Sequence, residues 1–178
     1  REGVRLCRFI PEVDGLFGNR APGRVPEIVQ AVVSGNRPAF FPEEYQEIPQ
    51  APSVLSMPGS AYLKIAEGCS NRCSYCSIPL LRGDLRSRPP EEVVADARRY
   101  IDAGVVEINL IAQDLASYGT DAAGIDLPGL IRLILEIPGE YWLRMLYIHP
   151  DHFPEELLEI CATDPRLLPY FDIPFQHA

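Results

Sequence analysis

The 178-residue sequence has no apolar run long enough to cross a membrane, and its first residues have no apolar segment typical of a signal peptide. It also lacks an even number of cysteines. It has five, and three of them lie within eight residues. This pattern argues against a disulfide framework. It favours thiolates that bind a metal in a reducing, cytoplasmic setting.

Positive charge is also scarce. The chain has 16 Lys and Arg against 25 Asp and Glu, which gives a formal net charge of -9. An acidic surface repels phosphates, so tight binding to a bare nucleic-acid backbone is disfavoured and a basic protein partner is favoured. The apolar fraction, 47%, is typical of a globular protein.

In the first third of the chain, strand and helix patterns stop at residue 36 and a Pro-rich stretch begins at residue 37. Residues 11–18 predict a strand, and Pro26 fits the first turn of a helix with one apolar stripe. Five prolines between residues 37 and 60 exclude a continuous helix or a central strand there. We therefore expect residues 1–36 to end an α/β domain, residues 37–60 to form a Pro-rich linker, and residues 61–178 to form a second domain.

Strands and helices alternate in the second domain. The predicted strands are residues 61–66, 105–111, 142–148 and 170–173, and the predicted helices begin near Pro90, at 127 and at 154. This alternation is typical of parallel βαβ units, so the fold class is α/β. In a closed barrel and in an open sheet alike, an active site lies at the carboxyl ends of the strands.

A cysteine cluster follows the first strand of that domain. The stretch "EGCSNRCSYCSIP" spaces Cys69, Cys73 and Cys76 as CxxxCxxC. Soft thiolates select iron–sulfur clusters, zinc or cuprous copper. An ordinary cubane is held by four cysteines, so three would leave one iron open for a small-molecule ligand. The alternative is a structural zinc site completed by a remote histidine, although such sites usually have two pairs of ligands.

The other two cysteines have apolar neighbours. Cys161 shares an apolar helix face with Leu157 and Leu158, and Cys7 lies beside Leu6. A buried free cysteine behaves as a small hydrophobic residue. We expect Cys7 and Cys161 to pack in the core rather than bind a metal.

The CxxxCxxC spacing is the signature of the radical S-adenosylmethionine (SAM) superfamily, and residues 61–89 resemble the methylthiotransferases of the MiaB and RimO type. Three segments resemble the RimO branch: "RGDLRSRP" after the cysteines, "IAQDLASYGTD" at 111–121 and "YFDIPFQHA" at 170–178. Residues 11–18 resemble the end of the family's N-terminal domain. The resemblance covers nearly the whole chain.

This resemblance implies a radical SAM partial (βα) barrel, which is a truncated TIM-like fold. It implies a 4Fe–4S cluster on Cys69, Cys73 and Cys76, with SAM on the open iron. A second 4Fe–4S cluster is implied on cysteines that would precede Arg1, and the last barrel strands would follow Ala178. We therefore expect the chain to be a fragment that does not turn over alone.

The resemblance also implies a substrate. RimO-type enzymes methylthiolate the β-carbon of an aspartate of ribosomal protein uS12, so the small ribosomal subunit and an electron donor are the implied partners. The family alternative is a methylthiotransferase for tRNA adenosine carrying an N6-isopentenyl or threonylcarbamoyl group. An RNA-modifying enzyme should show a basic stripe, which this sequence lacks. Direct tRNA binding is therefore disfavoured.

Several side chains are candidates for the SAM site. By resemblance, Tyr75 matches an aromatic residue near the adenine. Gln113 is uncharged and stands where many radical SAM enzymes have an acidic motif that holds the SAM amino group; the alternative is ordinary strand-end and turn polarity. Arg144 interrupts a strand, and a charge that faces a barrel interior needs a partner, so it is a candidate for the SAM pocket. Ser117 and Tyr118 are further candidates for the mouth of the site.

Two groups of polar residues keep alternative roles. Arg82, Arg86 and Arg88 could bind the carboxylate of SAM or of an acidic substrate, or could pair with nearby acidic side chains. His149 and His177 follow strands and could face the site, or could be hydrogen-bonded loop residues. Neither histidine is expected to be a general base, because abstraction of a hydrogen atom by a radical needs none.

Overall fold

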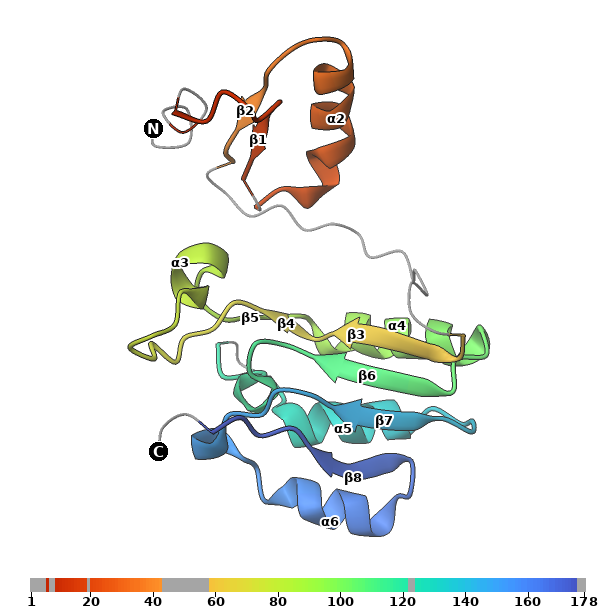
Figure 1. Cartoon of the computed structure of the whole chain (residues 1–178). Coiled ribbons are helices and arrows are strands. Elements are labelled where there is room, and N and C mark those ends of the chain that lie inside the picture. Colours follow the sequence, from red (N-terminus) through yellow and green to blue (C-terminus); the bar gives the residue numbers. More distant parts are fainter. Residues whose placement is uncertain (1–5, 7–8, 19, 43–57, 122–123, 176–178) are drawn as a thin grey trace. The chain divides into compact units, whose positions relative to one another are not determined.

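The computed structural model describes residues 6, 9–18, 20–42, 58–121 and 124–175 (Figure 1). The chain divides into two compact units, Arg1–Ala51 and Pro52–Ala178, and the division falls within the residues predicted as a linker. Cys7 and His177 lie outside the described residues. No helix in the described ranges is long and apolar enough to cross a membrane.

The first unit contains a small parallel sheet and one helix. Its elements are β1 (Leu16–Phe17), the 3-10 helix η1 (Pro22–Arg24), α2 (Val25–Val33) and β2 (Ala39–Phe40). The rings of Phe17 and Phe40 stack across the two strands with centroids 5.8 Å apart. β2 lies in the stretch that the sequence assigns to the linker, so the start of that stretch pairs with the strand before α2.

The second unit is built on a four-stranded parallel sheet. Its strands, in the order β3-β6-β7-β8, are Ser60–Lys64, Glu107–Ile111, Trp142–Met145 and Leu167–Phe171. The predicted α/β class with parallel βαβ units is confirmed. β8 begins three residues earlier than predicted, because it pairs with β7 through an irregular register that tolerates Pro169.

Three helices cover one face of this sheet: α4 (Pro90–Asp102), α5 (Leu127–Leu135) and α6 (Glu156–Thr163) (Figure 1). Leu63, Leu110 and Leu143 point into this layer and are fully buried. Their neighbours along the strands, including Tyr62 and Arg144, project from the opposite face, where Tyr62 is 55% exposed. The alternation of side chains therefore separates an apolar core from a more polar open face.

Short elements that the sequence did not reveal surround the cysteines. β4 (Ala66–Glu67) and β5 (Arg86–Ser87) pair antiparallel, and α3 (Ile78–Arg82) lies between them. Two 3-10 helices follow the central strands: η2 (Leu115–Ser117) after β6 and η3 (Pro150–His152) after β7. Elements of two to five residues have too little periodicity to be recognised from sequence.

Candidate functional site

The cysteine loop leaves the sheet through a residue that must be glycine. Gly68 has φ +78°, and a Cβ on it would lie 2.2 Å from the carbonyl oxygen of Asp84. One residue further on, the Cys69 N–H donates to the carbonyl of Gly83 at 3.2 Å. The β4–β5 pair and these close contacts therefore join the two ends of the loop.

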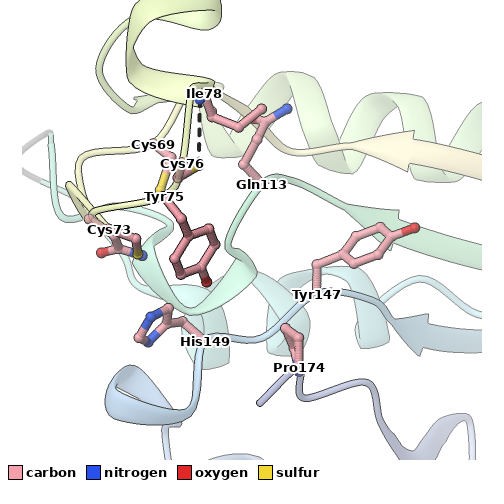
Figure 2. A pocket seen from close by; sticks show the side chains of 10 residues that line it. Cys69, Cys73, Tyr75, Cys76, Ile78, Gln113, Tyr147, His149 and Pro174 are labelled. Carbon is pink, nitrogen blue, oxygen red and sulfur yellow. Dashed lines mark hydrogen bonds between the residues drawn. The ribbon is translucent and has the colours of Figure 1, made fainter. Parts of the chain in front are cut away.

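The structure brings the three clustered cysteines to one pocket. Cys69, Cys73 and Cys76 line a cavity with about 450 Å³ of empty space, open solvent at its mouth included (Figure 2). The Cys76 N–H donates to the Cys73 carbonyl at 3.0 Å, and the Ile78 N–H lies 3.5 Å from Cys76 Sγ. The three cysteines therefore border one shared space.

The rest of the pocket comes from the carboxyl ends of three strands. Gln113 follows β6, Tyr147 and His149 follow β7, and Pro174 follows β8 (Figure 2). Nδ1 of His149 accepts a hydrogen bond from the Asp151 N–H at 3.3 Å. The proton of the neutral imidazole therefore resides on Nε2, which makes that atom a donor.

Two candidates for SAM binding line this pocket. Oε1 of Gln113 is buried and accepts no hydrogen bond among the described residues. A buried acceptor without a donor costs free energy, so it is suited to receive a donor from a ligand. The Tyr75 side chain also lines the pocket and is largely exposed.

Asp114, next to Gln113, is the hydrogen-bonding centre of the site. Its buried carboxylate accepts from Asn71 Nδ2, the N–H groups of Ala116 and His149, Ser117 Oγ, and the ring of His152. Burial alone would raise the pKa of Asp114, but the hydrogen bonds, led by those of Ser117 and Asn71, lower it below its ordinary value. The sequence assigned this residue no role, although an aspartate directly before a turn, with serine three residues later, is typical of a cap.

Ser117 and Tyr118 do not line the pocket, so the expectation that they flank its mouth is wrong. Ser117 turns toward Asp114. The Tyr118 hydroxyl donates to the Arg88 carbonyl at 2.8 Å, and burial raises the pKa of Tyr118 to about 12. After η2 the backbone packs closely on itself, because Gly119, with φ +82°, lies against the Ile125 backbone. The preceding residue, Tyr118, is buried in the core.

Arg144 finds its partner within the sheet. Its Nε lies 2.9 Å from Oε1 of Glu107 on β6, and its guanidinium lies 4.9 Å from the ring centroid of Tyr170 on β8. The sequence correctly required a partner for this charge, and Glu107 supplies it. Arg144 is not among the residues that line the described pocket, so its role toward SAM stays a prediction.

The three loop arginines also contact protein groups. Arg82 Nη1 lies 3.4 Å from Oε1 of Glu67, and Arg86 donates to the Arg82 carbonyl at 3.2 Å. Arg88 forms a 2.6 Å ion pair with the buried Asp96 of α4. These contacts favour the interpretation in which the arginines organise the loop and anchor α4.

The chemistry of the donor set fits a cluster with an open iron. Three soft thiols line one pocket, and a cubane held by three cysteines keeps one iron open for a small molecule. A closed zinc site would need a fourth donor at the same centre. Cys161 packs against the core instead, with Sγ 3.9 Å from the Leu168 carbonyl oxygen.

The sequence is similar to several known proteins. The radical SAM superfamily model matches residues 63–178. The ribosomal protein uS12 methylthiotransferase RimO of Moorella thermoacetica is 43% identical over 175 residues, which are 97% of this chain and 40% of that protein. RimO of Syntrophotalea carbinolica is 44% identical over 176 residues, which are 97% of this chain and 39% of that protein.

The chain therefore spans about two fifths of the length of these relatives. Among solved structures, the radical S-adenosylmethionine methyltransferase TsrM of Kitasatospora setae aligns with 57% of this chain and 20% of its own, at a TM-score of 0.45 and 21% identity. The superfamily model covers more than half of the chain, including all three clustered cysteines. The chain belongs to the radical SAM superfamily.

Proposed function

We propose that this chain is part of a methylthiotransferase that adds a methylthio group to the β-carbon of an aspartate of ribosomal protein uS12. The observation that carries the proposal is 43–44% identity, over 97% of the chain, to relatives named for that activity. The net charge of -9 suits a basic ribosomal protein better than it suits RNA. A ribosomal substrate places the reaction in the cytoplasm.

The pocket supplies groups for the cofactors of the superfamily, which are a 4Fe–4S cluster and SAM. Cys69, Cys73 and Cys76 would hold the cluster. When bound, the cluster and SAM supply a carbon radical that takes a hydrogen atom from the substrate. Gln113 Oε1 would accept a hydrogen bond from the SAM amino group, and the Tyr75 ring would lie against the adenine.

We assign residues 1–36 to the end of an N-terminal methylthiotransferase domain, 37–60 to a linker, and 61–178 to an incomplete radical SAM core. On this assignment the second cluster lies on residues outside the chain. The isolated chain is then expected to bind one cluster and not to methylthiolate a substrate. An external electron donor completes the set of partners.

The first test is anaerobic reconstitution of this chain with iron and sulfide. A brown protein with a broad absorption band near the blue end of the visible spectrum is expected. A colourless protein that binds zinc instead would contradict the cluster site. Methylthiolation of uS12 by the isolated chain would contradict the assignment of the missing parts.

The second test uses the full-length protein, SAM and a reductant, with small ribosomal subunits and unmodified tRNA offered together. Mass spectrometry should find the added methylthio group on an aspartate of uS12. Methylthiolated adenosine in the tRNA, with uS12 unchanged, would replace the proposal by the family alternative. A cluster-loaded protein that modifies neither substrate would refute both.

A further inference from the structure

Two loops that line the pocket are hydrogen-bonded to one carboxylate. Asn71, between the first two cysteines, donates from Nδ2 to Oδ2 of Asp114 at 3.0 Å. The backbone N–H of His149, in the loop after β7, donates to Oδ1 of the same carboxylate at 3.1 Å. These partners lie 43 and 35 residues from Asp114 in the sequence, so the carboxylate joins segments that only folding brings together.

The carboxylate itself is held in place. The Asp114 side chain is 3% exposed, it lies between β6 and η2, and it caps η2 by accepting from the Ala116 N–H at 3.1 Å. Ser117 Oγ and the ring of His152 donate to Oδ2. Hydrogen bonds to a charged acceptor are stronger than bonds between neutral groups, and five donors leave the carboxylate little freedom to rotate.

The loop segment that Asn71 occupies needs such an anchor. It has no helix or strand between Gly68 and Tyr75 in the described structure. Arg72 has φ +51°, a conformation that non-glycine residues rarely adopt and that persists only where the surroundings impose it. A hydrogen bond from the preceding residue to a fixed carboxylate is such a constraint.

We propose that Asp114 is a positioning residue, which through Asn71 holds the segment between Cys69 and Cys73 against the end of β6 and so preorganises the cysteines for the cluster. Outer-shell groups of this kind orient metal ligands, and their loss commonly weakens metal binding by 10- to 100-fold. The inference rests on the proposed cluster site and is independent of the identity of the substrate.

Three variants of the reconstituted chain separate positioning from general stability. Asn71→Ala removes the link between the cysteine loop and Asp114, and it also shortens a side chain that lines the pocket. Asp114→Asn keeps the shape of the side chain but removes its charge. Ser117→Ala is the matched control, because it removes a donor to the same oxygen from within η2. The measurements are the rate of iron release to a chelator and the electron paramagnetic resonance spectrum of the reduced cluster with and without SAM.

Asn71→Ala and Asp114→Asn should release iron about tenfold faster than the parent protein and should change the spectrum. Ser117→Ala should stay close to the parent in both measurements. Equal release rates for Asn71→Ala and the parent would overturn the inference, and so would a Ser117→Ala rate as fast as that of Asn71→Ala. Should Asp114→Asn fail to fold, Asn71→Ala still decides. A parent protein that takes up no cluster would instead refute the proposed site.

Discussion

Asp96 and Asp114 are both buried aspartates, 5% and 2% exposed, yet their surroundings differ. Asp96 lies on α4 and pairs with the guanidinium groups of Arg88 and Arg99. Asp114 lies at the end of β6 and accepts most of its hydrogen bonds from neutral N–H and O–H groups in three loops. The ion pair of Asp96 with Arg88 joins α4 to the segment that precedes it, whereas Asp114 joins the loops that surround the pocket.

The same contrast holds for the regions around these two residues. The layer between the sheet and its helices is apolar and fully packed, so it provides a rigid support. The strand ends carry cysteines, an unsatisfied amide oxygen and a strained tyrosine, Tyr147 with φ +68°. The apolar layer therefore supplies stability, and the strand ends carry the groups suited to bind a ligand. Substitutions in the two regions should have different effects.

The largest expected effect is on the cluster. Cys73→Ala should abolish cluster binding, because two cysteines cannot retain a cubane that already lacks a fourth. Cys161→Ala should leave cluster binding unchanged, because that thiol packs against the core. Iron content and visible absorption after anaerobic reconstitution measure both. Full iron loading of Cys73→Ala would show that the metal site is not in this loop.

The next effect is on the packed layer. Leu110→Ala should lower the free energy of unfolding by about 2–5 kcal/mol, because it leaves a cavity in a fully buried position. Tyr62→Ala, on the open face of β3, should cost much less because the side chain is about half exposed. Urea denaturation of the cluster-free protein measures both values. Equal losses in the free energy of unfolding would mean that the side chains on the open face are also packed against other parts of the protein.

A smaller effect is expected on SAM affinity. Gln113→Ala should weaken SAM binding by about tenfold, the equivalent of one hydrogen bond from a charged donor, and should leave the cluster in place. Gln113→Glu should restore binding, because its carboxylate also accepts from an ammonium group. Titration of the reconstituted protein with SAM measures this. An unchanged affinity in Gln113→Ala would remove the residue from the site.

The smallest effect concerns the ion pair on the open face. The hydrogen bond from Arg144 holds the pKa of Glu107 below its ordinary value, against the opposing effect of burial. The pair therefore stabilises the fold above the unfolded-state pKa of about 4.3, and this contribution is lost as the pH falls through the lower folded-state value. Arg144→Met should cost about 1 kcal/mol or less at pH 7.

As the pH falls through the lowered pKa of Glu107, the difference between Arg144→Met and the parent should shrink, because Glu107 loses its charge. Urea denaturation at pH 7 and at about pH 3 checks this. A difference that does not change with pH would show that Arg144 acts through packing on Tyr170 rather than through its charge.

Local patterns predicted the parts of the structure that depend on neighbouring residues. Pro90 with two following glutamates marks the start of α4, and Gly104 with φ +81° marks its end. Alternating runs of strand and helix residues predicted parallel strands, and β3, β6, β7 and β8 do pair parallel. β4 and β5 were missed, because a strand of two residues exists only through its partner.

The same distinction applies to the site. A CxxxCxxC loop after a strand predicted one place for three thiols, and the structure gathers them in one pocket. The bonds of Asp114 to Asn71 and of Arg144 to Glu107 span 43 and 37 residues, and no spacing rule links such partners. These bonds form because parallel strands, and the loops that follow them, lie side by side in the folded chain.

The sequence by itself determined the alternation of strands and helices, the apolar face of the sheet and the set of thiols, because each depends on residue type and short-range spacing. Only the tertiary structure decided which buried carboxylate serves the scaffold and which serves the pocket. The physical reason is that a buried charge must be satisfied by whichever donors the fold brings to it, and those donors come from distant segments of the chain.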